Sequence, residues 1–303
     1  MTALSALVPI FLLLLTGLAA RRCGLLDGAA AAGLNRLVVM VALPALLLLK
    51  VGTSPLQVSF APAVALVTAG LTIAAAVGGV LAARWVGLPA RQQGVAAQAV
   101  MRSNIAFVAF PVVLTALGED ALRVAAVTGA VLIPVMNFLS VAVLEWAHSG
   151  ARTTWQVALR VAVNPLVAAA TAGLGLAALG WQPWPWLEGF LAILADFALP
   201  GALLALGAEL SAGRWVPLWR PVVAVAAGKM LVVPLLGWWL MSLMGVSGHD
   251  LVVGVLLLGA PTAVASYSVA AQLGGDTALA GACLVATTAV TPLTYFAILV
   301  ILA

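Results

Sequence analysis

Four polar residues, Gln98, Arg102, Ser103 and Asn104, interrupt a long apolar stretch in the first half of the chain. An arginine at the centre of a membrane helix costs about 2.5 to 3.5 kcal/mol on insertion scales, so its guanidinium is expected to face protein or water. The side chains of Ser103 and Asn104 can bond the backbone groups that a broken helix leaves free. These residues therefore predict a helix break that carries polar, ligand-binding side chains.

A second interruption occupies the equivalent place in the second half. Adding 156 to 104 gives position 260, within Gly259-Ala260-Pro261-Thr262, where the proline removes a backbone donor and clashes with the preceding turn. Two helices broken at the same depth are expected to cross near the membrane centre, where the positive ends of half-helices attract an anion. The alternative is that each break is only a kink, because proline and glycine are common in membrane helices.

Lys229 and Asp196 are the ionisable residues predicted to lie deepest among the other apolar stretches. Lys229 has valines four residues away on both sides, so its partner must be another helix, a carbonyl or a substrate. The lysine could neutralise a carboxylate ligand or change protonation, or it could snorkel to the interface. Asp196, one turn before Pro200, could carry a proton or pair with Lys229, or it could have a structural role.

Two further polar residues, Asn137 and Tyr267, lie deep in apolar stretches and are expected to line a cavity or to form interhelical hydrogen bonds. With them, the predicted substrate-binding set is Arg102, Ser103, Asn104, Asn137, Lys229, Pro261, Thr262 and Tyr267.

Patterns typical of catalysis or metal binding do not occur in the sequence. His148 and His249 are isolated, the spacing of Cys23 and Cys283 suggests neither a disulfide nor a metal site, and no glycine-rich phosphate loop is found. We therefore expect no cofactor, no metal, no enzymatic activity and no bound ATP as the energy source.

The composition requires a membrane environment for the elements that position these residues. Of the 303 residues, 65% are hydrophobic and 7% are charged, whereas a soluble domain is about 25% charged. Long continuous apolar runs favour membrane-spanning helices over a barrel. The net charge of +4 comes from scattered basic residues, which argues against nucleic acid as a partner and leaves the lipid bilayer.

Ten apolar runs are long enough to span a membrane. The predicted spans are 4–20, 34–50, 60–83, 91–117, 121–146, 157–178, 188–210, 216–244, 250–272 and 277–302. The first run has no preceding basic residue, which argues for a retained helix rather than a secretory signal.

The second half of the chain repeats the first at an offset of 156 residues. Leu43-Pro44 recurs as Leu199-Pro200 and Gly17 as Gly173. The chain is therefore predicted to be an all-α membrane protein of two five-helix repeats, residues 1–150 and 151–303. Because each repeat has an odd number of spans, the second would insert upside down relative to the first, as in many transporters.

Basic residues predict the orientation in the membrane, because they concentrate in cytoplasmic loops. Those assigned to one side are Arg21, Arg22, Arg36, Arg84, Arg91, Arg152, Arg160, Arg214 and Arg220, against only Lys50 and Arg123 on the other. Both termini are thus expected outside the cytoplasm. The outer loop 181–186, Trp-Gln-Pro-Trp-Pro-Trp, is expected to be an interfacial anchor.

Several motifs together resemble the auxin efflux carrier family of membrane transporters, and the resemblance covers the whole chain. The motifs are Leu43-Pro44-Ala45-Leu46-Leu47, the run from Arg102 to Pro111, Ala205-Leu206-Gly207-Ala208-Glu209-Leu210, and Ala260-Pro261-Thr262 leading to Gln272-Leu273-Gly274-Gly275-Asp276.

The resemblance implies a fold similar to that of bile acid sodium symporters. Spans one, two, six and seven would form a scaffold and the others a transport subdomain, with an organic anion bound where spans four and nine cross. Asn104 would contact the substrate, Pro261 would break the helix and Lys229 would lie beside the crossing. An elevator movement and a homodimer are also implied.

The third span departs from the family pattern, because plant members carry an acidic residue there and this chain has only Thr68 and Thr72 as polar candidates. Proton coupling would then require Asp196. The favoured hypothesis is a transporter of small carboxylates in the plasma (inner) membrane of a bacterium. The alternatives are a sodium-coupled symporter, and a membrane enzyme or scaffold without transport.

Overall fold

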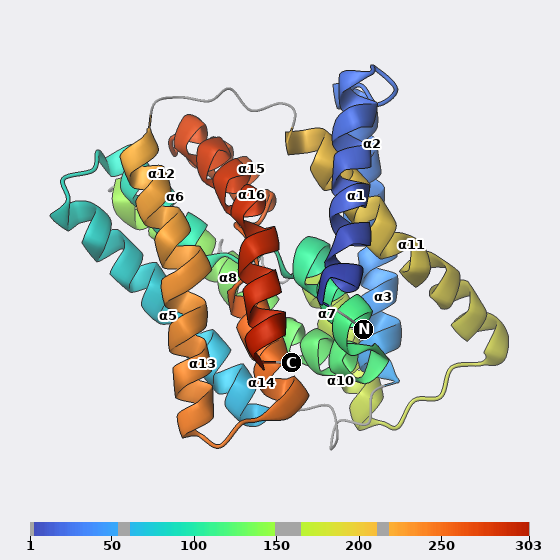
Figure 1. Cartoon of the computed structure of the whole chain (residues 1–303). Helices are drawn as coiled ribbons and strands as arrows, with labels where there is room; N and C mark the ends of the chain where they lie inside the picture. The colour runs from blue at the N-terminus through green and yellow to red at the C-terminus, as the bar shows by residue number, and fades with distance from the viewer. Residues whose placement is uncertain (1–2, 54–60, 149–164, 211–217, 303) are drawn as a thin grey trace. The chain divides into compact units, whose positions relative to one another are not determined.

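The computed structural model describes residues 3–53, 61–148, 165–210 and 218–302. Within these ranges the chain is helical apart from turns and one isolated β-bridge, and no strand is formed (Figure 1). The predicted helical class is therefore confirmed for this part of the chain. Arg152, Arg160 and Arg214, which contributed to the predicted orientation, lie outside the described residues.

Each of the ten predicted spans overlaps a helix or a run of helices in the described residues. The first half contains α1 (Ala3–Arg22), α2 (Gly28–Leu37), η1 (Val38–Ala42), α3 (Leu43–Gly52), α5 (Pro62–Trp85), α6 (Ala90–Met101), η2 (Ile105–Ala109), α7 (Phe110–Leu117) and α8 (Glu119–His148). The second half contains α10 (Pro165–Ala178), α11 (Pro185–Leu210), α12 (Trp219–Ala227), η3 (Gly228–Val232), α13 (Val233–Leu243), α14 (Gly248–Leu258), α15 (Ala265–Gln272) and α16 (Thr277–Leu302).

Six of the described helices are long and apolar enough to cross a membrane, counting α2 to α3 and α12 to α13 as single helices. The segments Ile105–Leu117 and Gly248–Leu258 are shorter apolar helices, because a break separates each from its continuation. The inverted arrangement of ten spans stays a prediction.

Turns at equivalent positions of the two halves adopt the same conformation. Gly24 and Gly180 have φ angles of 77° and 65°, and Gly118 and Gly274 have φ angles of 88° and 74°. Each pair is 156 residues apart. Because glycine has no Cβ, it enters this left-handed region without strain, so the repeated glycines end equivalent helices in both halves.

Three π-helical segments, η1, η2 and η3, each end two residues before a proline, namely Pro44, Pro111 and Pro234. A proline inside a helix lacks the N–H that would bond the carbonyl four residues earlier, and its ring clashes with that carbonyl. In all three places this carbonyl lies in the π-helical segment, where the wider turn relieves the clash. These prolines therefore explain the π-helices, of which η3 carries Lys229.

Contacts divide the chain into two compact units. Unit 1 comprises residues 1–61, 106–133 and 162–212, and unit 2 comprises residues 62–105, 134–161 and 213–303. Boundaries between the units fall inside the third, fourth, fifth and sixth predicted spans, and both predicted repeats contribute to each unit. The assignment of whole spans to a scaffold and a transport subdomain stays a prediction.

Small residues allow the helices of unit 1 to pack closely. A Cβ at Gly17 of α1 would overlap the carbonyl oxygen of Leu204 on α11, and a Cβ at Gly207 of α11 would overlap that of Leu14. In the second repeat, a Cβ at Gly173 of α10 would lie 3.0 Å from Cβ of Val51 on α3. Close backbone approach through glycine is a common way to join helices in lipid, where the hydrophobic effect contributes little.

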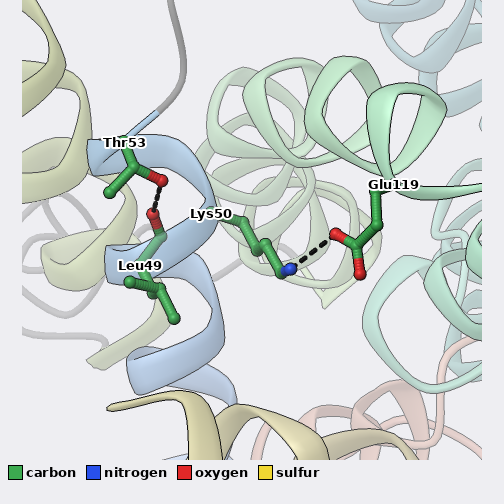
Figure 2. A network of polar contacts seen from close by, with 4 residues as sticks. All are labelled: Leu49, Lys50, Thr53 and Glu119. Carbon is green, nitrogen blue, oxygen red and sulfur yellow. Dashed lines mark hydrogen bonds and ion pairs between the residues drawn. The ribbon is translucent and has the colours of Figure 1, made fainter. Parts of the chain in front are cut away.

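An ion pair joins α3 and α8 in unit 1 (Figure 2). Lys50 Nζ donates to Oε2 of Glu119 at 2.5 Å, and the side chains are 24% and 54% exposed. Lys50 lies in the last turn of α3 and Glu119 in the first turn of α8, so each charge also interacts favourably with its helix dipole.

Replacing Glu119 with glutamine is expected to lower the free energy of unfolding by less than about 1 kcal/mol, because exposed ion pairs contribute little. Thermal unfolding of the purified protein at low and high salt measures this effect. A loss of stability that persists in high salt would show that the pair has more than a surface role.

Candidate functional site

The two predicted helix breaks are present in unit 2, and their backbones pair. Ser103 and Thr262 form an isolated antiparallel bridge. The backbone N–H of Asn104 donates to the carbonyl oxygen of Pro261 at 2.7 Å, and that of Ala263 donates to the carbonyl oxygen of Arg102 at 3.0 Å. Each break thus supplies partners for the backbone groups that the other leaves free, as membrane depth requires. The predicted breaks are confirmed as more than kinks.

Thr262 secures this pairing through both its hydroxyl and its backbone. Its Oγ1 donates to the carbonyl oxygen of Ala99 in the last turn of α6 at 2.8 Å, and its N–H donates to Oγ1 of Thr287 on α16 at 3.1 Å. Thr262 was predicted to contact a substrate. The hydrogen bonds that the structure assigns to it join α6, the second break and α16.

Lys229 is 1% exposed and lies beside the first break. Its Nζ donates to Oγ of Ser103 at 2.5 Å, and this hydroxyl lies 3.4 Å from the carbonyl oxygen of Leu258. A residue of the break between α6 and η2 therefore supplies its partner, and the snorkelling alternative is wrong. The one ion pair in the described ranges joins Lys50 and Glu119, so no described carboxylate pairs with Lys229.

Asn104 presents an unused donor beside this lysine's partner. The residue is 3% exposed, its backbone N–H is bonded, and its Nδ2 has no hydrogen-bond partner in the described part of the chain. A buried donor without a partner costs about 1 to 3 kcal/mol. Asn104 follows Ser103 directly in the chain, and Lys229 bonds the Ser103 hydroxyl, so the break carries both an unused amide donor and a nearby cation. These are groups that can bind a carboxylate.

The side chain of Arg102 faces protein, as the sequence predicted. It lies on the side of the break opposite to the Ser103 hydroxyl and Lys229. Its Nη2 donates to Oδ1 of Asn137 at 2.6 Å and its Nη1 to Oγ of Ser140 at 3.1 Å, both on α8. The backbone of Arg102 is extended, with φ −91° and ψ 99°, so consecutive side chains point to opposite sides. Arg102 and Asn137 thus belong together, away from the Ser103 hydroxyl and Lys229.

Tyr267 and Asp196 form none of the hydrogen bonds found at the bridge. Tyr267 is 46% exposed on α15, and its ring lies near Gly281 of α16. Asp196 is exposed on α11 in unit 1, whereas Lys229 belongs to unit 2. The pairing of Asp196 with Lys229, and its role in proton coupling, stay predictions.

The polar residues of the third predicted span, Thr68 and Thr72, are buried on α5, and their hydroxyls bond carbonyls of the same helix. Sequence reasoning missed Ser140 and Thr287. Ser140 follows Asn137 by three residues and thus shares its helix face, a spacing that could have identified it. Within the described ranges, no group of three or more His, Cys, Asp or Glu residues could hold a metal ion.

A family model described as membrane transport protein matches the chain twice, over residues 2–156 and 149–299. Together the two matches cover nearly the whole chain. No curated protein matches the chain significantly.

Proposed function

Because the chain belongs to the auxin efflux carrier family, whose members are membrane transport proteins, we propose that it is a secondary transporter of small organic anions. Carboxylates are the substrate class, and the ligand binds at Lys229, beside the break that carries Ser103 and Asn104. The observation that carries the proposal is the buried ammonium of Lys229, bonded to a neutral hydroxyl.

Charge balance favours an anion at this place. Removing an ammonium from water costs several kcal/mol, and attraction to a nearby opposite charge offsets this only where the pair is well hydrogen bonded. A carboxylate on Lys229 would supply the missing charge, and Nδ2 of Asn104 would donate to its second oxygen. The neutral pair is then easier to move through a low-dielectric layer than either charge alone.

An elevator movement is part of the proposal. The bridge, Lys229 and Asn104 all belong to unit 2, so this unit would carry the ligand as one body. We further propose a homodimer in the plasma membrane with both termini outside the cytoplasm, as the family resemblance and the basic residues suggested.

Flux in proteoliposomes tests the proposed function. A panel of mono- and dicarboxylates is assayed with imposed pH and sodium gradients, so the coupling ion is read from the same experiment. Saturable carboxylate flux supports the proposal, and flux that needs a sodium gradient identifies a symporter. If no carboxylate gives saturable flux or raises the melting temperature, the proposal is wrong.

Replacing Asn104 with alanine is expected to raise the half-saturating carboxylate concentration about tenfold or more, since a hydrogen bond to a charged group contributes about 1.5 to 3 kcal/mol. The initial rate of uptake measured against substrate concentration gives this value. The same substitution at Asn35 on α2 of unit 1 is the matched control and should leave it within about twofold. Equal values for the Asn104 variant and the unchanged chain would remove Asn104 from the site.

A further inference from the structure

Unit 2 contains a second buried cation whose neutral partners leave its charge uncompensated. Arg102 is 9% exposed and donates to the oxygens of Asn137 and Ser140, and no described carboxylate forms an ion pair with it. The proposed carboxylate site lies on the Lys229 side of the break, whereas Arg102 points toward α8. Its charge therefore needs an explanation of its own.

An amide with no partner lies one turn before Arg102. Gln98 is fully buried, and neither its Oε1 nor its Nε2 has a hydrogen-bond partner in the described residues. The contacts of Gly94 and Arg102, four residues before and after Gln98, show which neighbouring helix Gln98 faces. A Cβ at Gly94 would lie 2.7 Å from the carbonyl oxygen of Val143, and Arg102 bonds Asn137 and Ser140 one turn or two farther along α8. Because residues four apart share a helix face, Gln98 lies between these contacts.

A third buried polar group faces α6 from α15. Ser266 is 2% exposed, and its Oγ has no partner in the part of the chain that the structure describes. Thr262, one turn earlier, bonds the carbonyl oxygen of Ala99, and Ala270, one turn later, packs in a cluster with Val95 of α6. Ser266 is therefore positioned along α6 between these two contacts.

We propose that Arg102 and Gln98 hold a small inorganic anion of the chloride class, at a site separate from that of the transported carboxylate. The guanidinium has five N–H donors and the structure assigns two of them to α8, while the Gln98 amide has two more. With the amide turned so that Nε2 faces the guanidinium side, these donors surround one uncompensated positive charge and match an anion better than a cation.

A second carboxylate group of the transported substrate does not explain these donors. Arg102 and Ser103 are consecutive residues of an extended segment, so their side chains lie on opposite faces of the bridged segments. A small dicarboxylate would have to pass through that pairing to reach both cations. The resident anion instead balances the charge of Arg102 and stabilises the contact between α6 and α8.

Bromide is the direct probe of this site. Crystals of the full chain grown with sodium bromide are expected to give an anomalous peak in contact with Arg102 and the Gln98 amide. A peak confined to Lys229, or no peak within unit 2, would overturn the proposal.

Thermal unfolding in solution tests the same site independently. The melting temperature of the unchanged protein is expected to rise saturably when sodium chloride replaces sodium gluconate at constant ionic strength. Gln98→Met should raise the half-saturating chloride concentration about tenfold or more, and Arg102→Gln should abolish the rise. Lys229→Gln is the matched control and should keep the chloride response while losing carboxylate binding. A chloride response equal in all three variants would show a general salt effect and overturn the assignment.

These outcomes separate this inference from the proposed transport function. Loss of carboxylate flux with an intact bromide peak would leave the anion site standing. Carboxylate flux that is normal in gluconate, together with no bromide peak, would leave the transport proposal standing and remove the anion site.

Discussion

Replacing Lys229 with glutamine is expected to abolish carboxylate transport without destabilising the protein. Glutamine keeps a donor for Oγ of Ser103 but removes the buried charge. Leaving one member of a buried charge pair without its partner costs about 3 to 5 kcal/mol, so carboxylate affinity should fall by more than about a hundredfold. Flux in proteoliposomes and carboxylate-dependent shifts of the melting temperature measure the loss.

The sign of the stability change separates a binding role from a structural one. Without ligand, the uncharged side chain no longer bears the cost of a buried ammonium, so the melting temperature should be unchanged or higher. Lys50→Gln is the matched control, because it breaks the exposed pair with Glu119 and should leave flux within about twofold. Normal flux in the Lys229 variant, or a large drop in its melting temperature, would contradict the proposed role.

Replacing Gly207 with alanine is expected to prevent α1 and α11 from packing. The added methyl group would overlap the carbonyl oxygen of Leu14 and would lie 3.0 Å from the backbone N of Leu18. Since backbone atoms cannot rotate away as a side chain can, the helices must separate along their contact. We expect a loss of more than about 4 kcal/mol, in the range that mutational surveys treat as exceptional.

The matched control for this substitution lies on the same helix. A Cβ at Gly189 of α11 meets nothing within 4 Å, and alanine favours helix over glycine by about 1 kcal/mol, so Gly189→Ala should be neutral or stabilising. Size-exclusion profiles and melting temperatures in detergent compare the two variants. If Gly207→Ala elutes and melts like Gly189→Ala, close helix packing through Gly207 is not required.

Much of the site was predictable because its signals are local. Pro261 lacks an N–H wherever it lies in a helix, and Ser103 and Asn104 offer side chains to free backbone groups in any fold. The offset of 156 residues connected the two breaks, and the structure pairs them at Ser103 and Thr262. Long apolar runs likewise predicted helices that the described residues confirm.

Other residues could not be placed from their own surroundings. The valines beside Lys229 indicated that its partner is distant, but not that the partner is Ser103, 126 residues away. The turn of Arg102 toward α8 depends on the extended backbone at the break. The exposure of Asp196 and Tyr267 depends on which helices cover α11 and α15, and apolar residues flank both positions whichever side faces the protein.

The amino-acid order alone thus specified a helical membrane protein, the positions of its two helix breaks and the presence of buried charge. These features follow from backbone hydrogen bonding, steric limits at proline and glycine, and the cost of polar groups in lipid, all of which act within a few residues. Folding in three dimensions settled which side of the break each cation occupies and which donors remain unbonded. Those outcomes depend on contacts between segments that are distant in the chain, such as Arg102 with α8 and Lys229 with Ser103, and no local pattern encodes them.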